Sequence, residues 1–149
     1  MKTTTNALSM LTKDHKDVKA MFEQFEGLSD RSKANKKKVA DQICHALTVH
    51  TQLEEKIFYP AVREAINDED MMDEAVVEHA SAKKLIEQIQ GMETDDDLYD
   101  AKIKVLSEQI EHHVREEEDE MFPKVRKTGL DLDLLGEQMS ALKQQIDTL

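Results

Sequence analysis

The stretch His50–Pro60 reads HTQLEEKIFYP, and His113–Pro123 reads HVREEEDEMFP. In each stretch a His is followed four residues later by a Glu and then by a second Glu, and an aromatic residue and a Pro close the run. The flanks repeat as well, because DHKDVKAMFEQFEGL at Asp14–Leu28 returns as EHASAKKLIEQIQGM at Glu78–Met92, and the offset is 64 residues in the first half and 63 in the second. The chain is therefore a duplicated pair of helices, and each copy carries two His and one Glu at matched positions.

Four long patterns of apolar residues at steps of three and four predict four helices. Asn6 and Gly27 are the expected N-cap and C-cap of the first helix. Pro60 should break or kink the second, leaving a short turn, and Pro123 should end the fourth. The acidic run Thr94–Asp97 is expected to cap the fourth helix at the positive end of its dipole. The expected bounds are about 6–26, 32–59, 67–91 and 98–123.

Short connections between long amphipathic helices favour an all-α fold, an up-down-up-down antiparallel four-helix bundle. A fifth apolar stripe follows Gly129 and predicts an additional C-terminal helix. This stripe fits a helix that covers the bundle, and it also fits a self-association seam that would make a homodimer. We expect residues 1–149 to form a single domain, with the bundle at about 6–128 and the C-terminal helix at about 131–149. The stripe consists of Leu132, Leu135, Met139, Leu142, Ile146 and Leu149.

Composition narrows the classes of partner. The 149 residues carry a net charge of −12, which opposes binding to nucleic acid or to an anionic membrane. Cys44 is the single cysteine, so an intrachain disulfide and a cysteine-based zinc or iron–sulfur site are excluded. The first residues contain no apolar run typical of a signal peptide, and no stretch approaches a membrane span. A cytoplasmic location is expected.

A His lies on the core-facing seam of each of the four helices, and on two helices a Glu follows it four residues later. Residues i and i+4 of a helix lie about 40° apart, so each His–Glu pair points the same way. Two buried carboxylates facing each other would be costly unless cations lie between them. A pair of divalent cations, each taking two imidazoles and sharing both carboxylates, removes this cost. Imidazole and carboxylate donors suit iron, manganese or zinc. The six candidate ligands are His15, His50, Glu54, His79, His113 and Glu117.

Other His and Glu residues near these candidates are expected to have different roles. A lone His on an apolar seam is more often a hydrogen-bonded core residue, but four at matched positions with two matched Glu favour metal. His112 and Glu116 also fit H-x3-E, yet they lie one residue off the seam and are expected to be flanking or solvated. His45 should lie on the surface. Glu55 and Glu118 are expected to be solvated, although one could accept a hydrogen bond from a ligand.

The order H…H-x3-E…H…H-x3-E, with each second motif leading to an aromatic-Pro end, resembles the hemerythrin-like (HHE, cation-binding) domain. The resemblance extends from about Leu8 to Pro123. It implies two non-heme iron ions inside a four-helix bundle, with the four His as terminal ligands. Glu54 and Glu117 would be bridging carboxylates, and an oxo or hydroxo group would complete the bridge.

One departure from the oxygen-carrying hemerythrins bears on function. Those proteins have an H-x3-H pair on the third helix, whereas Ala75 and Lys83 flank His79 at these spacings here. The second bridging acid is also Glu117, four residues after its His, whereas the oxygen carriers have an Asp one residue later relative to its His. The chain is thus similar to a four-His, two-Glu branch, which leaves a coordination position open on each metal and favours reaction or sensing over reversible carriage.

Several functions stay open on the sequence alone. The first hypothesis is a di-iron protein that binds, senses or reacts with O2, peroxide or nitric oxide. The alternatives are an iron-handling or iron-sensing module and a reversible oxygen-binding protein. An iron–sulfur repair role fits less well, since such proteins commonly carry an N-terminal Cys-bearing segment, and a non-metal helical interaction domain leaves the matched His and Glu unexplained. No general acid or base is identifiable beyond the ligands, so the sequence does not establish catalysis.

Overall fold

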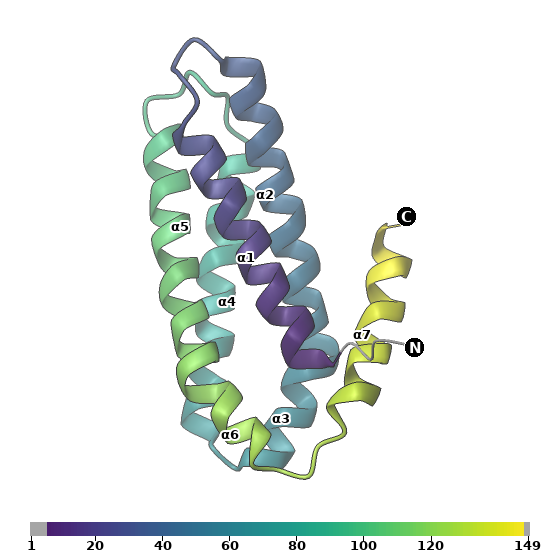
Figure 1. Ribbon diagram of the computed structural model, residues 1–149. Coiled ribbons are helices and arrows are strands. Elements are labelled where there is room, and N and C mark those ends of the chain that lie inside the picture. Colours follow the sequence, from purple (N-terminus) through teal and green to yellow (C-terminus); the bar gives the residue numbers. More distant parts are fainter. Residues whose placement is uncertain (1–5, 148–149) are drawn as a thin grey trace.

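The computed structural model describes residues 6–147, and these are helical with short connections. Two long antiparallel helices from each copy form a four-helix bundle, and a further helix packs against its side (Figure 1). The all-α bundle with an additional C-terminal helix is therefore confirmed. The elements are α1 (Ala7–Glu26), α2 (Lys33–Leu53), η1 (Glu54–Phe58), α3 (Tyr59–Ile66), α4 (Glu69–Gln90), α5 (Tyr99–Glu116), η2 (Glu117–Met121), α6 (Phe122–Arg126) and α7 (Leu132–Asp147).

The helix ends follow local side-chain chemistry. The side chain of Asn6 accepts a hydrogen bond from the Ser9 backbone N–H at 2.9 Å, so Asn6 is the N-cap of α1 as predicted. Asp68 caps α4 in the same way, accepting from the Met71 N–H. The prediction that the acidic run Thr94–Asp97 caps the fourth helix is wrong. The N-cap of α5 is Leu98, whose side chain makes no capping hydrogen bond.

In each copy, the helix that carries the H-x3-E motif passes through one π-helical turn at that motif. These turns are η1 and η2, and each begins at the Glu of its motif. Pro123 does not end its helix as predicted, and the chain is not broken at Pro60. Pro60 lies in the first turn of α3, and Pro123 lies in the first turn of α6, where the missing N–H of a proline is tolerated. The chain therefore stays helical to Ile66 in one copy and to Arg126 in the other.

The bundle interior is divided into two apolar clusters with a polar layer between them. On α1, Leu11 belongs to one cluster and Val18 to the other, and His15 lies between them. On α4, Ala75 and Ala82 belong to the two clusters in the same order. The repeat thus places the matched polar residues at one level of the bundle, away from its ends.

The C-terminal helix α7 packs against α1, α2 and η1, on the side of the bundle away from α5 (Figure 1). Its Leu135 and Met139 are buried in the same apolar cluster as Phe58 and Leu8. This is the covering arrangement that the apolar stripe predicts; self-association through the stripe stays a prediction. Leu149, the last residue of the stripe, lies outside the described residues. No helix within residues 6–147 is long and apolar enough to cross a membrane.

Candidate metal centre

The six side chains singled out by the repeat meet inside the bundle. Each of them is at most 8% exposed, and the carboxylates of Glu54 and Glu117 are almost completely buried. They form two groups that share both carboxylates, and within each group the donor atoms lie within 4.8 Å of one another. The first group adds His15 and His50 to the two Glu, and the second adds His79 and His113.

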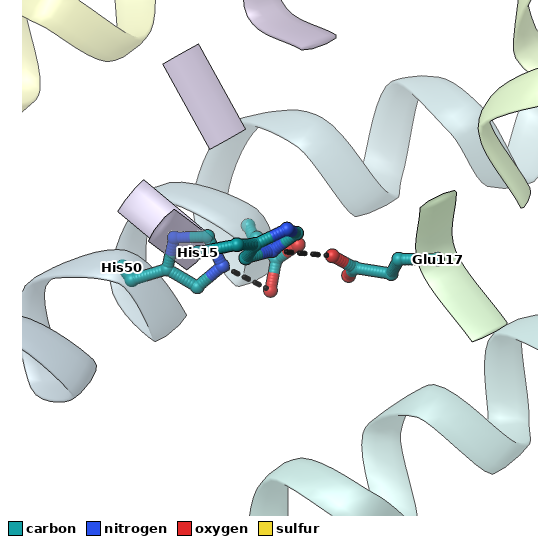
Figure 2. Close-up of side chains that lie close together, drawn as sticks. His15, His50 and Glu117 are labelled. Atoms are coloured by element: carbon teal, nitrogen blue, oxygen red, sulfur yellow. Dashed lines mark ion pairs between the residues drawn. The ribbon is translucent and has the colours of Figure 1, made fainter. Parts of the chain in front are cut away.

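The carboxylates lie between the two pairs of imidazoles. Glu117 turns Oε1 to His15 Nε2 at 3.2 Å and Oε2 to His113 Nε2 at 3.2 Å, so its two oxygens serve different groups. Figure 2 shows His15 and Glu117 facing each other, with His50 beside His15. Glu54 Oε1 lies 3.3 Å from His50 Nε2 and 3.0 Å from His79 Nε2. Both carboxylates are therefore positioned to serve two cations at once.

Each of the four imidazoles of the centre has a further carboxylate within hydrogen-bond distance of its Nδ1 atom. His50 Nδ1 lies 3.0 Å from Asp14, and its counterpart His113 Nδ1 lies 2.6 Å from Glu78. With Nδ1–H donating to these oxygens, each Nε2 faces the centre, where it can offer a lone pair to a cation once it has lost its proton. Asp14 and Glu78 were missed from the sequence, although an acidic residue directly precedes the first His in both copies.

The other two imidazoles are held by the second Glu of each motif. His15 Nδ1 lies 2.6 Å from Glu118, and His79 Nδ1 lies 3.0 Å from Glu55. The side chains of Glu55 and Glu118 are about one-third exposed, at 33% and 34%. The expectation that both are simply solvated is wrong, because the repeat uses both of them to orient imidazoles.

Three atoms of the centre have no hydrogen-bond partner among the described residues: His15 Nε2, Glu54 Oε2 and Glu117 Oε1. His15 Nε2 and Glu117 Oε1 are 3.2 Å apart, but they are not aligned as a hydrogen bond. A buried polar atom without a partner is costly, whereas a cation bound between such atoms satisfies them together. The donor set of imidazole and carboxylate also suits iron, manganese and zinc. The residues therefore fit a pair of divalent or trivalent cations.

Tyr59 is a further residue of the centre that the sequence pattern did not single out. Its hydroxyl donates to Glu117 Oε2 at 2.5 Å, and the hydroxyl oxygen also lies 3.2 Å from Glu54 Oε1. It also lies 3.1 Å from His79 Nε2 and 3.0 Å from His113 Nε2, so it touches all four residues of the second group. Burial and the charges of the two Glu raise the pKa of Tyr59 well above 10, which keeps the hydroxyl protonated in the absence of a cation.

The counterpart of Tyr59 in the other copy is Phe122, 63 residues later. The Phe122 ring stacks on His15 with the ring centroids 6.3 Å apart, and it has no hydroxyl to offer the first group. The two halves of the centre therefore have the same imidazoles and carboxylates but differ at this one position.

The charges of the centre are strongly coupled. Burial by itself would lower the pKa of His50, but attraction to Glu54 and the hydrogen bond to Asp14 outweigh it and raise the pKa to about 10. Burial opposes the charged form of His113 as well, yet hydrogen bonds to Glu117 and Glu78 raise its pKa to about 11. Protons thus take the place of cations in the metal-free centre, and binding a metal must release them.

A cavity of about 120 Å³ opens beside the centre, and all four imidazoles contribute to its wall. Its apolar sides come from matched positions of the two copies, Val18 with Ala82 and Leu47 with Ile110. A cavity of this size has room for a few water-sized molecules.

The remaining candidates lie where the register of the seam predicts. The side chain of His112 is 60% exposed, and that of His45 is 65% exposed and pairs with Asp147 at 3.4 Å. Glu116 is 30% exposed and lies on the outer side of α5 with His112.

Known proteins resemble this chain in fold and in sequence. A crystal structure of a hemerythrin HHE cation-binding domain-containing protein from Mycobacterium kansasii superposes with a TM-score of 0.80 over 95% of this chain and 86% of that one, at 23% identity. The chain is also 28% identical over 121 residues to a DNA nickase of Nostoc sp. (strain PCC 7120 / SAG 25.82 / UTEX 2576); the match is 81% of this chain and spans about a third of the relative, 34%. Residues 6–125 match the Hemerythrin HHE cation binding domain. The chain therefore belongs to the hemerythrin HHE cation-binding domain family.

Proposed function

We propose that the protein holds two non-heme iron ions at this centre and uses them to bind, sense or react with O2, peroxide or nitric oxide. His15 and His50 would bind one iron, and His79 and His113 the other, with Glu54 and Glu117 bridging. The observation that carries the proposal is the sharing of both buried carboxylates between the two groups of imidazoles. Two cations are the simplest occupants of such an arrangement, because one cation would leave half of the imidazoles unused.

We further propose that Tyr59 is a donor to the second iron. Two donor atoms that each lie about 2 Å from one metal ion are themselves about 3–4 Å apart. The Tyr59 oxygen is 3.0–3.2 Å from three donor atoms of the second group and 2.5 Å from the fourth.

This arrangement makes the first iron the site for an exogenous ligand. Phe122 offers no donor there, so a coordination position is left to a small molecule. The cavity beside the centre, with a volume of about 120 Å³, suits a diatomic molecule or peroxide and is too small for most metabolites. The iron would supply redox and Lewis-acid chemistry when bound, and the imidazoles, carboxylates and apolar walls would position the ligand and limit the access of water.

Two other functions are weighed against this one. Iron handling or sensing would use the same ligands. In the metal-free protein the buried imidazoles hold protons where iron would bind, so the stability of the fold would change with iron supply. DNA nicking is a property of a relative about three times longer than the matched segment. We do not propose it here, because a net charge of −12 opposes approach to a phosphate backbone.

Metal analysis and optical spectra test the proposal. Two tightly held irons per chain are expected, and the diferrous protein should oxidise rapidly in air to an oxo-bridged diferric form with near-ultraviolet charge-transfer bands. Peroxide or nitric oxide should perturb that spectrum. Stable reversible loading over many oxygen cycles would restore the carrier function. A spectrum that responds to none of these ligands, in a protein whose structure follows iron supply, would place sensing first.

A further inference from the structure

A second cluster of metal-binding side chains lies on the outer side of α5, apart from the buried centre. His112 Nε2 lies 3.0 Å from Glu116 Oε1 on the same helix and 3.5 Å from Glu78 Oε2 on α4. One imidazole and two carboxylates thus converge within 4.8 Å. The three side chains are 60%, 30% and 22% exposed, in the order His112, Glu116, Glu78, so a hydrated ion can reach them.

The duplication shows that this cluster is not a by-product of the repeat. The residues 63 positions before His112 and Glu116 are Val49 and Leu53. Both are buried in the apolar cluster that α7 covers. One copy thus carries an apolar pair beneath a helix, and the other carries an imidazole–carboxylate pair on a face that α7 does not cover (Figure 1).

The charges of the cluster favour a cation. Glu116 Oε1 and Glu78 Oε2 lie 3.0 Å and 3.5 Å from the same atom, His112 Nε2, so two carboxylates are held close together and their negative charges repel each other. A bound divalent ion relieves this repulsion more fully than one imidazolium does. One imidazole with two carboxylates, completed by water, is a donor set for iron(II), manganese(II) or zinc.

The outer cluster is connected to the buried centre through a single side chain. Glu78 turns Oε2 to His112 and Oε1 to His113 Nδ1, at 3.5 Å and 2.6 Å. His112 and Glu78 also line the cavity whose wall includes the four buried imidazoles. An ion bound outside would therefore lie at the edge of the space that leads to the centre.

We infer that Glu78, His112 and Glu116 form an outer site for a divalent transition-metal ion, from which metal enters the buried centre. The binding of an ion at this site depends only on the three outer side chains. Its role in loading rests on the proposed two-iron centre. The experiments below separate the two parts.

Binding is tested on the protein with its buried metals in place, by titration with Mn(II) at physiological salt while free Mn(II) is followed by electron paramagnetic resonance. One further ion should bind, and His112→Ala or Glu116→Gln should weaken it about tenfold or more. His45→Ala is the matched control, because it removes an equally exposed imidazole elsewhere and should change nothing. Equal Mn(II) binding by the protein with and without His112 would show diffuse attraction to an acidic surface and overturn the site.

The double variant Glu54→Gln, Glu117→Gln separates this proposal from the two-iron centre. It should lose the buried metals and still bind one Mn(II) that His112→Ala removes; loss of that ion as well would refute an independent outer site. Loading is measured as the rate of Fe(II) uptake by chelator-treated protein in stopped flow. His112→Ala should slow uptake about tenfold while the final content of tightly held iron stays the same. Unchanged uptake would refute the entry role even if the outer ion binds.

Discussion

The substitution Tyr59→Phe removes one hydroxyl from a fully buried set of donors. In the metal-free protein this hydroxyl donates to Glu117 at 2.5 Å and also lies 3.2 Å from a Glu54 oxygen. Leaving a buried polar group without its partner costs about 1–3 kcal/mol of unfolding free energy. For a chain of this length each kcal/mol lowers the melting temperature by about 2–4 °C, so chelator-treated Tyr59→Phe should melt about 2–12 °C lower.

The metal-loaded protein gives a second and independent signal. If Tyr59 binds the second iron, the diferric protein has a visible phenolate-to-iron charge-transfer band, which Tyr59→Phe abolishes. Phe122→Tyr is the matched control, because it offers a hydroxyl to the first group and should add a band of its own. Thermal unfolding by circular dichroism and absorption spectra measure both effects. An unchanged melting temperature in chelator, together with an unchanged visible spectrum, would refute the placement of Tyr59 in the centre.

Three further predictions test the centre. Glu54→Ala should cost both irons because it removes a shared ligand, whereas His15→Ala should cost one; full retention in both, by metal analysis, would mean the ligand set is wrong. His113→Ala should deplete tightly held iron and His112→Ala should not, and the reverse result would mean that α5 is rotated by one residue. In the metal-free protein the raised His50 pKa stabilises the fold fully below about 6.5, and this stabilisation is lost as pH rises through about 10. Chelator-treated protein should therefore lose more melting temperature between pH 7 and 10 than iron-loaded protein, whose bound imidazoles are already neutral; parallel losses would contradict this account.

The sequence predicts the helices well because their signals are local. Asn6 as an N-cap and Gly27 as a C-cap act within one turn, and the apolar seam of each helix reports which side faces the core. The predicted ligands all lie on those seams, and the structure brings the six together. Asp14 and Glu78 also recur, each directly before a candidate ligand, but each contacts an imidazole on a neighbouring helix, which their place in the sequence does not reveal.

Tyr59 was missed for a geometric reason. In a regular α-helix a residue five positions after Glu54 lies about 140° away from it around the axis. The π-helical turn η1 bonds the Tyr59 backbone N–H to the Glu54 carbonyl, five residues back, and this brings the two side chains onto one face. A seam drawn with the period of an α-helix selects Ile57 instead, which is only partly buried, whereas Phe58 and Tyr59 are buried. A π-helical turn contains one extra residue, and an apolar pattern with the 3.6-residue period of an α-helix does not reveal it.

The duplication distinguishes the features of the centre that both copies share from those that only one copy has. Matched imidazoles and bridging carboxylates, with a carboxylate behind each imidazole, recur in both copies and make two nearly equivalent places for a cation. Two positions break the equivalence. Under the proposed function, Tyr59 opposite Phe122 would close one half of the centre and leave the other open to a ligand, whereas His112 opposite Val49 puts a polar cluster at the edge of the cavity on one side only. Exchange at these two positions, rather than at the shared ligands, should therefore change reactivity and metal entry while the two-metal centre itself persists.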